Sequence, residues 1–418
     1  MDSSTSFTSF TSSTSCYNPR VTVTPHPDVA VIGAGAFGGW TALHLLERGA
    51  RIALVDAWEP GHPRGTSSGE SRVIRYGYGH KPIYTEWAWR ALAQWRRREQ
   101  EWRTPLLVPC GALFAYTEES GYSRACDAAL SKLKIPFQRF DAAELRRRYP
   151  QIALDGFAFG VLETDAGFLR AKLATRCVAR AVAEHASGRG RFVLGAVEAP
   201  QASAPSASPK PLEKIHLAGG ETLSAGAFVF ACGPWLPQLF PQFLGERIRP
   251  TKQDVFFFGT PPGEGRFNAQ NMPVWIDIAR EFYCIPAHDG RGFKVAYDRS
   301  GPRFDPTAGE RTSSPEILEL SRRYLAERFH ALAGAPLAEV RICQYERTPD
   351  SHLVIDRHPA FSNVWLAGGG SGHGFKLGPA VGEFVAAQMF DATPPAIPAE
   401  MRLGAIAFTG DDVTSLSF

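Results

Sequence analysis

The 418-residue sequence lacks the features that mark a membrane or secreted protein. No apolar run approaches the roughly 18 residues of a membrane span, and the first 27 residues contain no apolar signal core. The seven cysteines lie far apart, are odd in number and form no CxxC pair. Neither a disulfide framework nor a zinc site is therefore indicated. We expect a protein of a reducing compartment without a bound metal.

An excess of charge of one sign is also absent. The 45 basic and 42 acidic residues give a formal net charge of +3, which offers no electrostatic case for nucleic acid or a membrane surface. We expect a cytoplasmic protein, with a peroxisomal location left open for a eukaryotic source. The Ser/Thr-rich start predicts a mobile tail, although its few acidic residues leave a transit peptide open. The length predicts two domains.

What is present begins with a dinucleotide-binding pattern. An apolar strand at 29–32 leads into a GxGxxG loop, a helical pattern and a second strand that ends in an acid. Gly33 permits a tight turn, Gly35 lets the backbone approach a pyrophosphate, and Gly38 lets helix and strand pack closely. Asp56 lies where a carboxylate accepts the ribose hydroxyls. Because this acid disfavours a 2'-phosphate, NAD and FAD remain.

The order of the later strands favours FAD. A plain NAD domain continues with a second βαβ unit, whereas here a Gly/Ser loop and a helical stretch follow, and apolar strands return only at 227–235 and 363–376. The strand-like runs "ALFAY", "DVFFFG", "EFYCIP" and "GFKVAYD" indicate a mainly antiparallel sheet. We predict an α/β fold with a Rossmann-like FAD-binding domain, discontinuous in sequence, plus a substrate domain built on a mainly antiparallel sheet.

Domain boundaries follow from this strand order. We assign residues 28–106, 164–247 and 342–395 to the FAD-binding domain, 107–163 and 248–341 to the substrate domain, 1–27 to the tail and 396–418 to a C-terminal extension.

Six motifs, in this order, resemble the monomeric sarcosine oxidase family of amine-oxidising flavoenzymes, which has N-methyltryptophan oxidase and peroxisomal pipecolate oxidase as relatives. They are "GAGAFG", "VDAWEP", "GTSSGESRVIRYGYG", "GFKVAYD", "CQYERTPDSHLVIDRHP" and "GSGHGFKLGPAVGE", spread over residues 28–395. The resemblance implies a monomer that uses FAD and molecular oxygen to oxidise the C–N bond of a secondary, N-methyl or cyclic amino acid. The products are then an imine and hydrogen peroxide.

Three alternatives stay open. A dehydrogenase of the same kind passes electrons to a quinone or carrier instead of oxygen. An oxidase can act on primary or glycated amino acids. A chain of this kind can also bind flavin without activity and serve as a subunit.

The resemblance implies that Cys343 bonds covalently to the 8α-methyl carbon of FAD. Attack by the sulfur requires a thiolate, which a nearby positive charge stabilises. Arg341 and Arg347 are the basic residues nearest in sequence. A buried structural thiol is the alternative.

Four basic residues match family positions near the flavin. Arg75 and Lys376 are expected to hold the substrate carboxylate, for which a guanidinium fork is well suited. Arg72 is expected over the flavin ring, and Lys294 beside it, where an ammonium stabilises the charge that develops as oxygen is reduced. As alternatives, Arg75 is a surface cation and Lys294 a strand lysine that faces solvent.

The substrate pocket and the late glycine loop supply further candidates. Tyr283 is a candidate wall of the substrate pocket, with a core tyrosine as the alternative. Gly372, His373 and Gly374 precede a helix whose N-terminus is expected at the flavin N1–C2=O group. A structural loop histidine is the alternative for His373.

The sequence departs from the family pattern at three places. Ser67 and Ser68 stand where the family commonly has paired histidines, near the expected dimethylbenzene edge of the flavin. Asp298 takes the place of a family histidine close to the substrate. Glu346 and Arg347 occupy a stretch that is less charged in the family.

Overall fold

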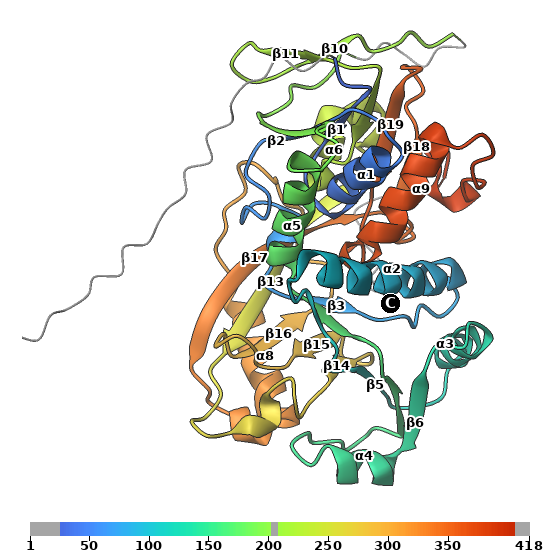
Figure 1. Ribbon diagram of the computed structural model, residues 1–418. Coiled ribbons are helices and arrows are strands. Elements are labelled where there is room, and N and C mark those ends of the chain that lie inside the picture. The colour runs from blue at the N-terminus through green and yellow to red at the C-terminus, as the bar shows by residue number, and fades with distance from the viewer. Residues whose placement is uncertain (1–25, 202–207, 406–418) are drawn as a thin grey trace, which may run out of the picture.

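The computed structural model describes residues 26–201 and 208–405. Most of the predicted tail and the end of the predicted C-terminal extension lie outside these residues. Figure 1 shows a helix-covered sheet in the upper part of the molecule and a second, larger sheet below it. Within the described residues no helix is long and apolar enough to cross a membrane.

The upper sheet has six strands, five of them parallel. Their order is β18 (Val354–Arg357), β19 (Val364–Gly368), β12 (Ala227–Phe230), β1 (Val29–Ile32), β2 (Ile52–Asp56) and β9 (Gly190–Leu194), with β18 antiparallel to β19. The apolar runs of β1, β2, β12 and β19 are buried, as expected for strands covered on both faces, whereas the edge strand β9 is partly exposed. The predicted first strand, its glycine loop and the second strand ending at Asp56 are confirmed.

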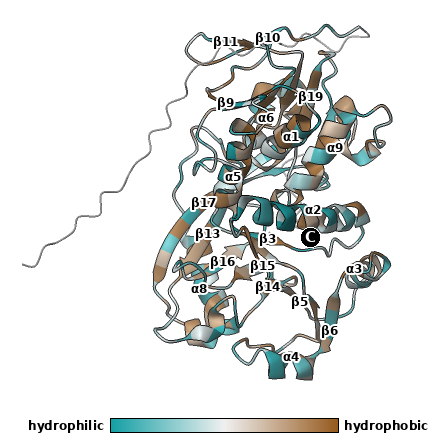
Figure 2. Cartoon of the chain, viewed as in Figure 1, coloured by the Kyte–Doolittle hydropathy of each residue, from teal (hydrophilic) through white to brown (hydrophobic). Residues whose placement is uncertain are grey.

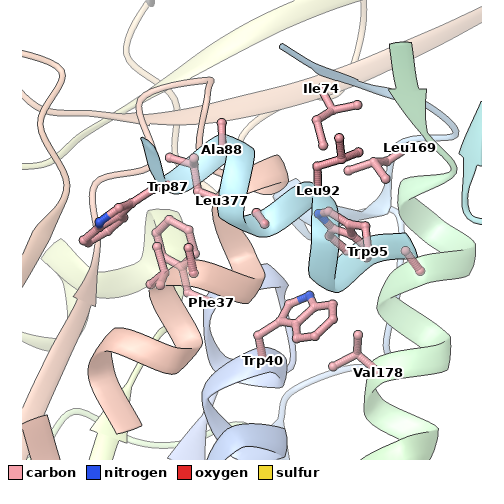
Figure 3. Close-up of a cluster of buried hydrophobic side chains, with 14 of the residues drawn as sticks. Phe37, Trp40, Ile74, Trp87, Ala88, Leu92, Trp95, Leu169, Val178 and Leu377 are labelled. Atoms are coloured by element: carbon pink, nitrogen blue, oxygen red, sulfur yellow. The ribbon is translucent and has the colours of Figure 1, made fainter. Parts of the chain in front are cut away.

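Helices pack tightly over this sheet. They are α1 (Ala36–Glu47), α5 (Ala171–Ala183), α9 (Gly378–Phe390), α2 (Pro82–Trp102) and the short α6 (Leu236–Leu239) and α7 (Pro241–Leu244). The ring centroids of Trp40 on α1 and Trp95 on α2 lie 4.9 Å apart, edge to face, and Figure 3 shows both among Phe37 and Val178. Such an aromatic pair stabilises the packing of two helices by more than its buried area alone would.

The lower sheet has eight strands. Their order is β17 (Leu337–Arg347), β13 (Arg249–Phe258), β16 (Phe293–Tyr297), β15 (Phe282–Ile285), β14 (Val274–Asp277), β5 (Ala112–Tyr116), β7 (Phe159–Glu163) and β6 (Phe137–Asp141). All neighbours are antiparallel except β14 and β5, so the prediction of a mainly antiparallel sheet is confirmed. Because β17 is continuous, it runs through the boundary predicted between residues 341 and 342.

Smaller elements complete the chain. They are α3 (Gly121–Lys132), α4 (Ala142–Arg148), α8 (Pro315–Arg328), the hairpin of β10 (Lys214–His216) and β11 (Thr222–Ser224), and 3-10 turns at Thr66–Ser68 (η1), Gly233–Trp235 (η2), Gly265–Phe267 (η3), His330–Leu332 (η4), Phe375–Leu377 (η5) and Ala399–Met401 (η6). Figure 2 shows hydrophobic residues along the sheet strands and hydrophilic ones over α4.

One predicted loop is partly a strand. The Gly/Ser-rich stretch after β2 contains β3 (Arg72–Ile74), which pairs with β8 (Gly167–Leu169), itself paired with β4 (Leu107–Val108). The loop prediction missed the β-branched pair Val73 and Ile74, and Ile74 is fully buried. The backbone that carries Arg72 is therefore fixed by a sheet.

Candidate active site

A cavity of about 490 Å³ opens at the carboxyl ends of β1, β2 and β12. Ligands of open α/β sheets bind at this edge. Predicted residues that line it are Gly33, Gly35, Asp56, Ser67, Ser68, Arg72, Cys343, Gly372 and Gly374. Residues from the start and the end of the chain thus meet in one cavity, as the fold prediction requires.

At two glycines of this loop, Gly33 and Gly38, there is no room for a side chain. Gly33 has φ +104°, and a Cβ there would lie 2.3 Å from the carbonyl oxygen of Ala231. A Cβ at Gly38 would lie 1.8 Å from the carbonyl oxygen of Gly33. The next helix, α1, begins at Ala36 and directs its N-terminus at the cavity. A cradle of this kind fits the pyrophosphate of a dinucleotide.

Polar side chains near this loop are held by backbone groups. The carboxylate of Asp56 accepts hydrogen bonds from the N–H groups of Ala34 at 2.6 Å and Trp58 at 3.0 Å. Burial raises the pKa of Asp56 above its ordinary value. Ser67 accepts a hydrogen bond from the N–H of Ala36 at 3.0 Å, and Ser68 donates to a backbone carbonyl at 2.6 Å.

A second, smaller cavity of about 50 Å³ adjoins the first. Predicted residues that line it are Arg72, Arg75, Tyr283, Asp298, Cys343, Gly372, His373 and Lys376. Arg72, Cys343, Tyr345, Gly372 and Phe375 line both cavities. These five shared residues mark where an occupant of the large cavity would meet an occupant of the small one.

Arg72 lies beside the sulfur of Cys343. Its guanidinium donates to Sγ at 3.2 Å and also to the carbonyl oxygens of Ser71 and Thr66, both at 3.0 Å. The two arginines nearest in sequence contact other groups: Arg341 pairs with acidic side chains, and Arg347 donates to two backbone carbonyls. The cation at the thiol is therefore Arg72, which sequence proximity did not predict.

Lys294 is buried close to Arg72. Its side chain, on β16, donates to the carbonyl oxygen of Ser71 at 2.9 Å, and its Nζ lies 5.4 Å from the ring centroid of Tyr283. Only 1% of the residue is exposed, so the alternative of a solvent-facing lysine is wrong. Burial, reinforced by the charge of Arg72, lowers its pKa well below the ordinary value.

Arg75 and Lys376 both line the small cavity, and both contact Tyr78. Lys376 donates to the Tyr78 hydroxyl at 2.8 Å and to the carbonyl oxygen of His373 at 2.9 Å. The guanidinium of Arg75 donates to the carbonyl oxygen of Gly77, and its Cζ lies 4.5 Å from the Tyr78 ring centroid. Both basic residues are 4% exposed, so Arg75 is not a surface cation.

The remaining predicted residues form the other walls. Tyr283, on β15, lines the small cavity and is not fully buried. Asp298 accepts a hydrogen bond from the Tyr345 hydroxyl at 2.8 Å. A nitrogen of His373 lies 2.9 Å from the carbonyl oxygen of Ser351. Burial and the charge of Lys376 lower the pKa of His373 well below the ordinary value, so its ring is neutral.

Sequence reasoning did not single out Tyr345, although it lines both cavities. A signal was available, because side chains two residues apart on a strand share a face and Tyr345 follows Cys343 by two. From the sequence, Glu346 was noted only as a charge where the family pattern is less charged. In the structure Glu346 lines the large cavity, and burial raises its pKa to about 7.

A glycine-loop cavity joined to a small pocket lined by Arg72, Arg75 and Lys376 is an arrangement typical of a dinucleotide-dependent oxidoreductase. Residues 28–388 match the family model described as FAD dependent oxidoreductase, and the chain belongs to that family. This membership identifies FAD as the cofactor, and the glycine cradle fits it.

Known proteins with similar sequences are named as sarcosine oxidases and N-methyl-L-tryptophan oxidases. The chain is 31% identical over 378 residues to monomeric sarcosine oxidase from Streptomyces avermitilis, covering 87% of this chain and 94% of that protein. It is 26% identical over 377 residues to N-methyl-L-tryptophan oxidase from Salmonella heidelberg, covering 88% and 95%. These matches confirm the predicted family resemblance and enzyme class.

The solved structure of L-proline dehydrogenase from P. horikoshii has a TM-score of 0.73 to this chain at 20% identity, covering 90% of this chain and 97% of that one. At that identity the likeness concerns the fold alone. The predicted fold class is confirmed.

Proposed function

We propose that the chain oxidises the C–N bond of a secondary, N-methyl or cyclic amino acid and reduces oxygen to hydrogen peroxide. The observation that carries this proposal is the junction of the two cavities. There a dinucleotide-sized space meets a pocket whose cations, Arg72, Arg75 and Lys376, favour an anionic substrate. The names of the sarcosine and N-methyl-L-tryptophan oxidase relatives support the choice of an N-methyl amino acid.

The cofactor site in this proposal uses both ends of the chain. Gly35 leaves space for the pyrophosphate, Gly33 and Gly38 permit the tight turn and the close packing beside it, and Asp56 holds the ribose. Ser67, Ser68, Gly372, His373 and Gly374 lie around the ring. Bound FAD supplies the acceptor for the hydride equivalent that leaves the substrate carbon. In this proposal residues 28–106, 164–247 and 342–395 bind FAD, and residues 107–163 and 248–341 form the substrate domain.

Arg75 and Lys376 hold the substrate carboxylate. A hydrogen bond to a charged group contributes about 1.5–3 kcal/mol. The contacts of Lys376 with Tyr78 and with a backbone carbonyl fix its ammonium, so little conformational entropy is lost on binding. Tyr283 and Asp298 form walls that restrict the substrate side chain.

Cys343 attaches the flavin covalently. The 3.2 Å contact with Arg72 supports this role, because a guanidinium at that distance stabilises the thiolate that attacks the 8α-methyl carbon. Lys294 lies behind Arg72 and adds positive charge where oxygen gains electrons. Preorganised charge of this kind is worth about 10²–10³ in rate.

The second candidate is a dehydrogenase that passes its electrons to a quinone or carrier. The buried Lys294 favours the oxidase, because its side chain donates to the carbonyl oxygen of Ser71, next to Arg72, which lines both cavities. We also propose a cytoplasmic monomer, in keeping with the free thiols of the six described cysteines.

The test measures oxygen consumption and hydrogen peroxide release with sarcosine, L-proline, L-pipecolate and N-methyl-L-tryptophan. Peroxide formed in step with oxygen, from any of these, supports the oxidase. Reduction of the flavin by substrate with turnover only in the presence of a quinone supports the dehydrogenase. A purified protein without FAD, and without reconstitution, refutes both.

A further inference from the structure

Glu346 is a buried carboxyl at the cofactor cavity that the proposed reaction does not use. It follows Tyr345 on β17, and successive side chains of a strand point to opposite faces. Its Oε2 accepts the N–H of Gly369, just after β19, at 3.2 Å, and the N–H of Gly370 also bonds to it. The residue is 8% exposed and lines the large cavity.

The carboxyl lies beside apolar side chains. A Cβ at Gly368 would lie within 4 Å of Leu236, of Ile248 and of Oε2 of Glu346. Burial raises the pKa of Glu346 to about 7, against the opposing effect of its two backbone hydrogen bonds. In the part of the chain that the structure describes, no cation neutralises this carboxylate, so its proton binding responds to a new charge nearby.

The titratable groups around Glu346 face other partners or stay neutral. Cys232, at the end of β12, has a pKa well above its ordinary value, because of burial and the charges of Asp56 and Glu346. On β17 itself, Arg347 donates to the carbonyl oxygens of Ser371 and Asp298. In the glycine loop, the neutral His373 ring contacts the carbonyl oxygen of Ser351.

Glu346 lines the large cavity and lies against the glycine loop that reaches the junction of the two cavities. A Cβ at Gly370 would lie 2.9 Å from Oε1 of Glu346, and Gly370 precedes Gly372, which also lines both cavities. The reacting ring of a cofactor that spans the large cavity is expected at this junction.

We propose that Glu346 is a proton-binding group coupled to the redox state of the bound cofactor, an inference that rests on the proposed function. Glu346 takes one proton from solvent when two electrons and one proton have passed from the substrate to the cofactor. It releases that proton when oxygen accepts two electrons and two protons to give hydrogen peroxide. The cause is electrostatic, since two extra electrons beside an unpaired carboxylate disfavour its charged form.

The test is the midpoint potential of the bound flavin as a function of pH, measured by anaerobic dithionite titration with reference dyes. One proton taken up per two electrons changes the equilibrium tenfold per pH unit, or about 30 mV, and two protons change it by about 60 mV. In the wild-type protein the slope approaches the two-proton value around pH 7. In Glu346→Gln it stays at the one-proton value throughout.

Glu221→Gln is the matched control, because it removes a charge from the exposed turn before β11. Its slope follows the wild type. Equal slopes in Glu346→Gln and wild type overturn the coupling while the flavin, and with it the proposed function, stands. Should Glu346→Gln not fold, proton uptake by the wild type on reduction, followed with a pH indicator, decides: one proton at every pH overturns the proposal. A protein without flavin refutes the proposed function itself.

Discussion

The guanidinium of Arg72 donates a hydrogen bond to Sγ of Cys343 at 3.2 Å, across 271 positions of sequence. The two residues come from β3 and β17, which belong to different sheets. Both line the two cavities. A cation fixed against a thiol at the junction of these cavities is the geometry that nucleophilic attachment of a flavin needs.

Replacing Cys343 by Ala is expected to abolish covalent attachment. After precipitation in acid, the yellow colour stays in the pellet of the wild type and moves to the supernatant of the variant. Cys232→Ala is the matched control, because this second thiol also lines the large cavity and lies away from Arg72. Colour retained in the Cys343→Ala pellet contradicts the linkage.

Replacing Arg72 by Met is expected to slow attachment without preventing FAD binding. The lost charge-assisted hydrogen bond, about 1.5–3 kcal/mol, corresponds to a rate about 10- to 100-fold lower. The measurement follows acid-stable flavin over time after apoprotein is mixed with FAD. Arg341→Met serves as control, since Arg341 pairs with Glu70 and Glu339 instead. Equal rates in both variants count against a role for Arg72.

Replacing Lys294 by Met is expected to reduce the reaction with oxygen by about 10²–10³-fold. Anaerobic reduction of the flavin by substrate is expected to change little, because Lys294 lies outside the lining of the small cavity. Stopped-flow absorbance separates the two half-reactions. Lys252→Met on the neighbouring β13 is the control. Loss of both half-reactions in Lys294→Met points to a structural role for this lysine.

The sequence predicted the first βαβ unit, because Gly33, Gly38 and Asp56 carry its geometry locally. It also predicted that late residues return to the cofactor cavity. The Arg72–Cys343 contact depends on how β3 and β17 approach each other in space. A strand as short as β3 is stabilised by its partner β8, and sequence periodicity over three residues carries little information.

The burial of Lys294 could be expected from the family resemblance but not from the strand pattern. An alternating strand allows a lysine to face solvent, and the 1% exposure of Lys294 excludes that alternative. Glu346 was visible only as an unusual charge. Its contact with the Gly369 N–H depends on how β17 lies against the loop after β19, and a local sequence pattern does not predict that arrangement.

Lys376 gives a prediction about pH. Burial and the charge of Arg75 lower its pKa well below the ordinary value. The ammonium form binds a carboxylate, so affinity for a carboxylate inhibitor is expected to fall as pH rises, well before the ordinary lysine range. Perturbation of the flavin spectrum on inhibitor binding measures this affinity. In Lys376→Met the affinity is about 10- to 100-fold lower and this pH dependence disappears. A pH dependence unchanged in the variant excludes Lys376 as its source.

Glu163 gives the last prediction, on stability. This residue ends β7, is 1% exposed, and accepts hydrogen bonds from the N–H groups of Tyr76 and Gly77, both at 2.6 Å. It thereby holds the backbone beside Arg75. Burial raises its pKa from 4.5 to about 7. Between these values the folded protein retains a proton that the unfolded chain has already released.

The folded state therefore binds more protons in this window, and the free energy of unfolding falls as pH rises through it. The contribution of Glu163 is at most about 3 kcal/mol. Urea midpoints measured from pH 5 to pH 8 are expected to fall in the wild type. They fall less steeply in Glu163→Gln, where the similarly raised pKa of Glu346 keeps part of the slope. Glu221→Gln, on the exposed hairpin, should match the wild-type slope; a slope in Glu163→Gln as steep as the wild type means that Glu163 ionises freely in the folded protein.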